Sequence, residues 1–537
     1  MAMSTELLVA AAVYSPSAPE ATAMAVRDGM ITWVGSHEVG RALHPDAEVL
    51  QFPGAFLTPA FVDTHVHTTS AGLAILGLDL TTAGSLRECL DLVCAYAARE
   101  PTGVLWGHGW DDSRWPERRP PTRAEVDDCA PGREVYLSRI DVHSALVSTL
   151  LVQRTDGVSG AAGWSAEGPL SQRAHHLVRD AARAGLGPDQ RATAQRALLD
   201  HAAAHGVVGV HECGGAEIGG LTDFRELVQF DHGVQVRGYW GEAVASVEQA
   251  RDVLARTGAH ALGGDLFVDG SLGSRTAWLT EPFCDDPQSA TNTGAHYLEV
   301  DQIAAHLRAC TQAGVQGGFH VIGDAAVAAV VAAVGQVVAE LGGPAVAARG
   351  HRLEHLEMVS AEHAAALGGW GVLASVQPMF DALWGGTDGV YAERLGPVRG
   401  PTLNPLATLA AAGVALAIGS DVPVTPLDPW AALRAAVHHR TPGQAISPRA
   451  AFTAATRGAW RAGGVRDGVA GTLIPGAPAS YAVWEVDELV VSAPVDAVQR
   501  WSLDPRSGVA PLPRLDPAAR LPRCLRTVHR GRVIYAR

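Results

Sequence analysis

Four β-type runs in this chain each end on a histidine or an aspartate, where the run passes into a loop. The residues that end them are, in order, His65 with His67, then His320, His355 and Asp421. In a barrel of alternating parallel strands and helices, the carboxyl ends of the strands meet at one rim, and active sites are built there. The order of these residues therefore predicts an α/β chain folded as a (β/α)8 TIM barrel, with one site at that rim.

The pair His65 and His67 indicates a metal site. Side chains two residues apart on a strand share a face, and zinc-like cations favour imidazole nitrogen. Taken alone, the pair could equally be two surface histidines, and Asp421 could equally cap a following helix. Because further ligand-type residues follow at intervals that suit successive strands, we expect a divalent metal, with zinc as the ion.

Strand-like segments alternate with alanine-rich, helix-like segments through the middle of the chain, as in a parallel barrel. More than eight strand candidates occur, so we expect an insertion after the first barrel strand, within about residues 70–180. The barrel is expected over residues 58–462. Both ends of the chain carry short β-type runs, at 7–13 and 527–535, which could pair into one small sheet domain.

Length and charge narrow the class of protein. At 537 residues the chain exceeds a usual single domain, and a net charge of −15 argues against nucleic acid as a partner. No apolar run reaches the roughly 18–20 residues that span a bilayer, and the run at 7–13 lacks the basic flank of a signal peptide. We therefore predict a cytoplasmic enzyme with a small-molecule substrate and no membrane partner; a homodimer stays open.

The seven cysteines are odd in number and scattered, and no two are spaced Cys-x-x-Cys. This pattern predicts reduced thiols rather than a disulfide framework or a cysteine zinc site. Cys213 is of most interest, because it follows an apolar run at 206–210 that ends at the predicted rim.

The combination of His-x-His, two later histidines and an aspartate on successive strands resembles the amidohydrolase superfamily. The run Asp-Gly-Ser-Leu-Gly-Ser-Arg-Thr-Ala at 269–277, with His320-Val-Ile-Gly-Asp324 and Gly419-Ser-Asp421, is similar to the amidohydrolase family 3 branch, which includes N-substituted formamide deformylases. The resemblance runs from about Thr5 to Val533. It implies that residues 1–57 and 463–537 pair into a small β-sandwich domain beside the barrel.

One position departs from the family pattern. Family members often carry a lysine four residues before the motif aspartate, where its carbamate bridges two metals, but this chain has no lysine and carries Asp265 there. A carbamate bridge is therefore impossible. Either Asp265 or another acid such as Glu212 holds a second ion directly, or the site holds one metal. We expect one, because an aspartate is too short to replace the bridge without backbone movement.

The predicted reaction is hydrolysis of a carbon–nitrogen bond other than a peptide bond (EC 3.5), in the amide of a small N-substituted compound. A cation held by imidazoles lowers the pKa of water from about 16 toward 7, which supplies hydroxide as the nucleophile. Asp421 is the predicted general base. His355 is either a ligand or a hydrogen-bond donor to the developing oxyanion.

The resemblance also implies contacts with the substrate. Segments around Trp110 and His143 resemble family segments that line the substrate pocket. Arg275 could bind a carbonyl or carboxylate of the substrate, or it could hold its own loop by pairing with Asp269, the other predicted contact in this loop.

Two other functions stay open. The first is a mononuclear deaminase of an amino-substituted heterocycle, which needs an acid to protonate the ring; Asp324 is the nearest acid after His320, and the resemblance implies a structural role for it. The second is a degenerate barrel that binds a ligand without turning it over.

Overall fold

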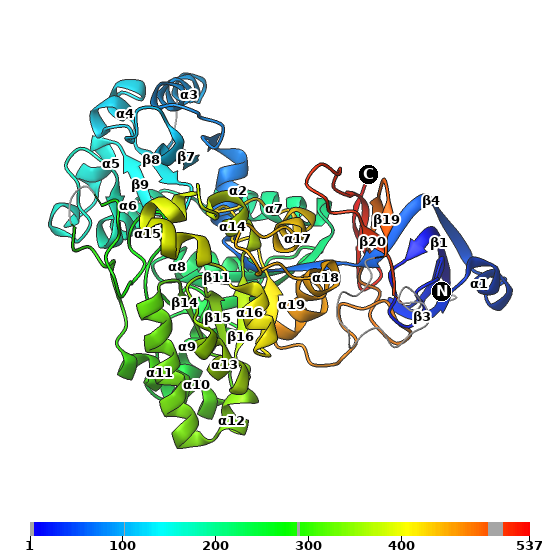
Figure 1. Ribbon diagram of the computed structural model, residues 1–537. Coiled ribbons are helices and arrows are strands. Elements are labelled where there is room, and N and C mark those ends of the chain that lie inside the picture. Colours follow the sequence, from blue (N-terminus) through cyan, green and yellow to red (C-terminus); the bar gives the residue numbers. More distant parts are fainter. Residues whose placement is uncertain (1–4, 101–102, 287–289, 492–508) are drawn as a thin grey trace.

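Eight short strands form the centre of the computed structural model, which describes residues 5–100, 103–286, 290–491 and 509–537 (Figure 1). They pair in two parallel sheets, in the orders β13-β12-β11-β5 and β14-β15-β16-β17. Isolated parallel bridges join Leu262 to Gly317 and Val66 to Val422, so the sheets meet at both edges in a TIM-barrel-like α/β core. The strands are β5 (Phe61–Val66), β11 (Val207–Gly215), β12 (Gln235–Gly241), β13 (Ala261–Leu262), β14 (Gly318–Val321), β15 (Arg352–His355), β16 (Leu373–Val376) and β17 (Ala415–Ile418).

Helices connect these strands and pack around them (Figure 1). They are α2 (Thr68–Leu76), α7 (Pro188–Ala204), α8 (Gly220–Val228), α9 (Val247–Thr257), α10 (Val300–Ala313), α11 (Asp324–Leu341), α12 (Gly343–Ala347), α13 (Ala361–Gly369), α14 (Pro378–Trp384), α15 (Val390–Arg399), α16 (Leu406–Ala411), α17 (Pro429–Val437), α18 (Pro448–Ala455) and α19 (Arg457–Ala462). Local sequence sets their ends. In α9 the Ser246 side chain accepts a hydrogen bond from the Gln249 amide, and Gly258 ends the helix in the left-handed conformation.

Helix α11 is long and apolar enough to cross a membrane by length and composition alone, with a mean hydropathy of 1.7 over 18 residues. The sequence shows no unbroken apolar run of that length here, because Gln336 and Glu340 interrupt the apolar residues. In the fold it packs against α10 and α13. Val327, Val330 and Val334 are buried in the main core, so barrel packing accounts for its apolar face.

The segment that follows α2 forms a separate unit with its own sheet, in the order β10-β9-β8-β7-β6 (upper left in Figure 1). Its strands are β6 (Leu78–Asp79), β7 (Leu105–Trp110), β8 (Val135–Arg139), β9 (Ser144–Val147) and β10 (Leu170–Ser171). Its helices are α3 (Leu86–Arg99), α4 (Arg123–Cys129), α5 (Thr149–Arg154) and α6 (Gln172–Ala184). Cys94 and Cys129 form a disulfide between α3 and α4. The prediction that all the cysteines are reduced is therefore wrong for this pair, because tertiary packing brings together two thiols 35 residues apart.

Both ends of the chain contribute to one seven-stranded sheet, in the order β22-β21-β18-β4-β1-β2-β3 (right in Figure 1). Its strands are β1 (Glu6–Val13), β2 (Ala23–Arg27), β3 (Met30–Gly35), β4 (Glu48–Pro59), β18 (Tyr481–Glu485), β21 (Arg523–His529) and β22 (Arg532–Ala536); α1 (His37–Leu43) packs beside it, and β19 (Leu489–Val490) pairs with β20 (Leu512–Pro513). Strand β4 pairs with β18 from the other end of the chain. Only Ala60 separates β4 from the first barrel strand, so the sheet is tied directly to the barrel.

Trp484, on β18, joins the terminal sheet to the barrel. Its ring packs edge-on against Phe61 and Trp430, at centroid distances of 5.8 and 5.5 Å. Its Nε1 donates to the Thr58 hydroxyl at 2.8 Å. A buried aromatic ring with a satisfied N–H contributes strongly to stability.

Truncating this side chain tests that contribution. We expect Trp484→Ala to lower the free energy of unfolding by about 3–5 kcal/mol, because it leaves a cavity between the sheet and the barrel. Urea unfolding followed by circular dichroism measures the change. Val398→Ala, at a side chain that is 80% exposed, serves as the control and should change it by less than about 0.5 kcal/mol. A similarly small effect of Trp484→Ala would contradict this account.

Candidate metal centre

Two imidazoles and two carboxylates meet at the carboxyl end of β5. His65 Nε2 lies 3.3 Å from Asp265 Oδ1 and 3.5 Å from Asp421 Oδ1. His67 Nε2 lies 3.3 Å from Asp265 Oδ2 and 3.2 Å from Asp421 Oδ1. All four residues are buried. The sequence-predicted residues His65, His67, Asp265 and Asp421 are therefore brought together, although they are scattered along the chain.

These separations suit a shared cation. Ligand atoms at about 2.0–2.1 Å from one ion in a tetrahedron lie about 3.3–3.4 Å apart, and the observed separations span 3.2 to 3.5 Å. His65 Nε2 and the Oδ1 atoms of Asp265 and Asp421 are buried and have no hydrogen-bond partner among the described residues. Because buried polar atoms are normally satisfied, these atoms suit a divalent ion. Two close groups of ligand atoms share His65: one contains His67 and Asp265, and the other contains His355 and Asp421.

The charges of the two aspartates favour a cation at this site. Burial lowers the pKa of His67, but the carboxylates of Asp265 and Asp421 outweigh it and raise that pKa to about 9. Two acids facing two imidazoles must share either protons or a cation. A metal ion satisfies both acids at once and leaves both imidazoles neutral.

The backbone before Asp265 explains how a short side chain reaches the histidines. Strand β13 ends at Leu262, and Gly263 and Gly264 follow with φ of 159° and 70°. The positive φ of Gly264 favours glycine, and a Cβ there would lie 3.0 Å from the Cys213 Sγ. Asp265 follows this glycine pair and contacts His65 and His67.

A buried ion pair orients His65. Its Nδ1 lies 2.9 Å from Glu354 Oε2, and Arg352 Nε lies 2.7 Å from Glu354 Oε1. Because His65 Nδ1 donates to this carboxylate, the lone pair on Nε2 faces the two aspartates. Sequence reasoning missed this role. The available signal was that Arg352 and Glu354 are two apart on β15 and so share the face that points into the barrel.

His355, predicted as a ligand or as an oxyanion donor, is held by a hydrogen bond to Gln377. Its Nδ1 lies 2.8 Å from Gln377 Oε1, which places the ring proton on Nδ1 and the lone pair on Nε2. Burial and the neighbouring His320 lower the pKa of His355 well below its usual value, so the ring is neutral. His355, His65 and Asp421 offer ligand atoms within 4.8 Å of one another.

Backbone strain coincides with these residues. His355 has a φ of 70° and Asp421 a φ of 58°, in the left-handed region that non-glycine residues seldom adopt. Such strain collects at functional sites. Gln377, like Glu354, orients a histidine of the cluster, and no motif in the sequence marks either residue.

His320 lies beside the cluster but outside it. Its ring centroid is 4.5 Å from that of His355, and its Nδ1 is 3.6 Å from Asp269 Oδ1. The groups of ligand atoms within 4.8 Å of one another, among the described residues, do not include His320. It lines the cavity in front of the cluster.

Three predicted substrate contacts lie away from that cavity. The Asp269 carboxylate accepts the backbone N–H groups of Trp278, Ile322 and Gly323, at 2.7–3.0 Å, and is fully buried. Arg275 pairs with Asp285 at 2.9 Å rather than with Asp269. Trp110 donates from Nε1 to the Leu137 carbonyl at 2.8 Å, inside the core of the separate unit. These three side chains have structural roles, because they form hydrogen bonds or ion pairs with neighbouring groups of the protein.

Two acids considered from the sequence are also engaged elsewhere. Glu212 Oε2 accepts the Thr68 amide at 2.7 Å, at the start of α2. Asp324 Oδ1 accepts the Thr280 amide at 3.0 Å. Neither carboxylate belongs to the close ligand groups among the described residues.

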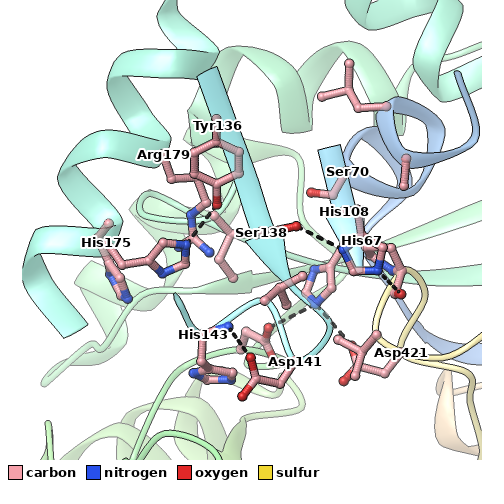
Figure 2. Close-up of a pocket in the computed structure, with 18 of the residues that line it drawn as sticks. His67, Ser70, His108, Tyr136, Ser138, Asp141, His143, His175, Arg179 and Asp421 are labelled. Atoms are coloured by element: carbon pink, nitrogen blue, oxygen red, sulfur yellow. Dashed lines mark hydrogen bonds and ion pairs between the residues drawn. The ribbon is translucent and has the colours of Figure 1, made fainter. Parts of the chain in front are cut away.

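A cavity with about 70 Å³ of space for the centres of water molecules leads to the cluster. One wall comes from the barrel rim, including His67, Asp421 and His320, and the other comes from the separate unit (Figure 2). His143, a predicted contact, lines it, and burial with the nearby His320 lowers its pKa to about 3.

His108 also lines this cavity and was not predicted as a contact. Its Nδ1 is 2.9 Å from the Ser138 hydroxyl, and its Nε2 is 2.7 Å from the Pro423 carbonyl. It therefore links the separate unit to the loop after Asp421. The segment around Trp110 was the sequence signal for this wall, although the predicted contact in it was Trp110 and not His108.

Comparison with known proteins then decides the family. A model described as the Amidohydrolase family, of the family 3 branch, matches residues 52–535. The chain belongs to this amidohydrolase family. The match confirms the resemblance predicted from the motif at 269–277 and the later histidine and aspartate motifs.

Two curated relatives of this amidohydrolase cover most of its length, and a third covers a short part of it. Protein LONG AFTER FAR-RED 3 of Arabidopsis thaliana is 28% identical over 521 residues, 89% of this chain and 87% of the relative. Putative amidohydrolase YtcJ of Bacillus subtilis (strain 168) is 26% identical over 459 residues, 79% of this chain and 82% of the relative. N-substituted formamide deformylase of Arthrobacter pascens is 33% identical over 133 residues, 24% of each chain.

The fold is shared with a solved structure. An uncharacterized metal-dependent hydrolase from Pyrococcus furiosus has a TM-score of 0.67 at 24% identity, over 90% of this chain and 99% of that chain. This likeness supports the TIM-barrel-like fold.

Metal content tests the centre. We expect protein purified without chelator to hold about one equivalent of divalent metal, and Asp265→Asn to weaken metal affinity at least about tenfold, because it removes an anionic ligand. Elemental mass spectrometry and titration against a chelating indicator measure these quantities. Asp200→Asn, at an aspartate that is 65% exposed, is the matched control. Two equivalents in the wild type, or unchanged affinity in Asp265→Asn, would overturn the assignment.

Proposed function

We propose that this amidohydrolase hydrolyses the amide of a small N-substituted compound, such as an N-substituted formamide, with one bound zinc ion. The observation that carries the proposal is the set of short ligand-atom separations among His65, His67, Asp265 and Asp421, which suits a divalent cation. The partial likeness to N-substituted formamide deformylase supports the choice of bond.

A divalent cation in this site supplies Lewis-acid chemistry that polarises the scissile carbonyl and makes hydroxide available near neutral pH. Asp421 takes a proton from the attacking water and passes it to the departing nitrogen. Water adds across the C–N bond, and the products are a carboxylic acid and an amine. The carboxylate of Asp421 faces both histidines and lines the cavity, so it can reach both the proposed ligands and a molecule in the cavity.

The other residues hold these groups in position. Glu354 fixes the tautomer of His65, and Gln377 fixes that of His355. Their buried hydrogen bonds keep the ligand lone pairs aimed at one point, which is what catalysis by positioning requires. We propose an eight-stranded (β/α)8 barrel with a terminal β-sandwich as the architecture that maintains this geometry.

A deaminase remains the second candidate because of one observation. Glu357 lines a cavity that also reaches His320, His355 and Asp421, so a carboxyl group stands beside the cluster where a ring-protonating acid is needed. Asp324, the acid suggested by the sequence, is bonded to Thr280 and does not line this cavity. A non-catalytic barrel is the third candidate, which the absence of bound metal would favour.

Partner and location stay predictions from the sequence. We propose a small-molecule substrate, no nucleic acid or membrane partner and a cytoplasmic location; the net charge of −15 supports the absence of a nucleic-acid partner. The state of association stays open.

Replacing the proposed base gives a direct test. We expect Asp421→Asn to lower kcat by roughly 100- to 10,000-fold, while circular dichroism and the melting temperature of the protein stay close to wild type. Metal content is determined on the same samples, so loss of the base is separated from loss of the ion. Asp324→Asn is the control and should keep kcat within a few-fold. Full activity of Asp421→Asn would show that the base is assigned wrongly.

The substrate screen that precedes this test uses formamides, acyl amides, lactams and amino-substituted heterocycles on the metal-loaded protein. Both organic products are identified, because ammonia release alone does not separate amide hydrolysis from deamination. Turnover of the heterocycles only would favour the deaminase.

A further inference from the structure

The cavity has a second polar end, on helix α6. Arg179 and Arg183 are four residues apart, on one face of this helix, and both line the cavity that reaches the metal centre. Figure 2 shows Arg179 grouped with Tyr136 and His175, on the side of the cavity away from His67 and Asp421. This end comes from the separate unit, whereas the metal centre comes from the barrel.

Both guanidinium groups lack part of their hydrogen bonding. Arg179 is 8% exposed, and its Nε is buried without a partner among the described residues; its Nη2 donates to the Glu217 backbone carbonyl. Arg183 has two such atoms, Nε and Nη1, and its Nη2 donates to the Ser70 hydroxyl. Neither arginine forms an ion pair with a carboxylate within the described part of the chain.

Nearby acids are engaged with other groups. Glu217 pairs with Arg173 at 2.5 Å and with His176 at 2.6 Å. Asp223 accepts hydrogen bonds from Thr69 and Gln195, and Asp180 is exposed.

Electrostatics add to this picture. Burial lowers the pKa of Arg183 and the adjacent Arg179 lowers it further, whereas Asp223 and Asp180 act in the opposite direction. Burial and Arg179 also lower the pKa of His175 well below its usual value, so this ring is neutral and adds no further positive charge. Arg179 is buried and Arg183 is half-buried, and two such cations close together favour an anionic ligand at this end of the cavity.

We propose that Arg179 and Arg183 bind a carboxylate of the substrate, at the end of the molecule remote from the amide that is cleaved. The inference rests on the proposed function, and it narrows the substrate class to N-acyl or N-formyl compounds that carry a carboxylate. Guanidinium groups bind carboxylates through paired, charge-assisted hydrogen bonds. Trp106, Tyr136 and Phe267 also line the cavity, which suits a substrate with an aromatic or apolar group.

Binding of a carboxylate that cannot be hydrolysed tests the subsite without turnover. Calorimetry on the metal-loaded protein compares 3-phenylpropanoate with 3-phenylpropanol, which lacks the charge. We expect the wild type to bind the carboxylate at least tenfold more tightly. Arg179→Gln and Arg183→Gln should each weaken binding of the carboxylate at least tenfold and change binding of the alcohol less than twofold.

Arg173→Gln is the matched control, because Arg173 lies on the same helix, is 52% exposed and does not line the cavity. It should leave both affinities unchanged. Circular dichroism checks that each variant is folded. If the glutamine variants fail to fold, the affinity ratio of the wild type decides, and equal affinities for the acid and the alcohol overturn the proposal.

The metal is the competing site for a carboxylate. Binding that disappears after metal removal, and that is unchanged in Arg179→Gln and Arg183→Gln, would place the carboxylate on the metal and overturn the proposal.

Turnover separates this inference from the proposed function. Hydrolysis of 4-(formamidomethyl)benzoate is compared with that of N-benzylformamide, which lacks the carboxylate. Equal kcat/KM values for the two substrates, unchanged in Arg179→Gln, would contradict the carboxylate subsite but not the proposed amidohydrolase activity. Arginine-dependent binding of the carboxylate without hydrolysis of any amide would support the subsite and contradict the proposed activity. We expect kcat/KM to favour the carboxylate at least tenfold.

Discussion

The opposition of two buried carboxylates to two buried imidazoles is the interaction on which this site depends. Asp265 and Asp421 lie within 3.5 Å of the Nε2 atoms of His65 and His67, where water screens little. A cation between them turns a costly cluster of buried charge into a stable one. The surrounding groups are arranged to the same end, since Arg352 balances Glu354 and Glu354 orients His65.

The fold allows this cluster because it brings distant strand ends to one place. His65 lies near the end of β5, Asp265 follows β13, and Asp421 follows β17. A parallel bridge between Val66 and Val422 joins the segment after β17 to β5. The separate unit between β5 and β11 then closes the space above the rim and contributes His143, His108 and the arginines of α6. The reaction would therefore be set by the barrel, and the choice of substrate by the separate unit.

Sequence reasoning placed the metal centre better than the substrate site. His65, His67 and Asp421, predicted from strand ends, lie together with Asp265, whereas His320 from the same pattern lies beside them. Asp269 and Arg275 were predicted as substrate contacts from a motif, yet Asp269 accepts three backbone N–H groups and Arg275 pairs with Asp285. A motif shows that a residue matters for the family, but it does not separate a loop-holding role from contact with substrate.

The sequence by itself determined the family, the order of strands and helices, and the residues able to hold a cation, because these follow from local periodicity and from motifs. Tertiary structure alone decided that Asp265 reaches the histidines, that Glu354 and Gln377 fix their tautomers, and that Arg179 and Arg183 face the same cavity. The physical reason is that such contacts depend on backbone dihedral angles and on pairing between distant segments. The conformations of Gly263 and Gly264, and the Cys94–Cys129 disulfide, are examples that no spacing in the chain predicts.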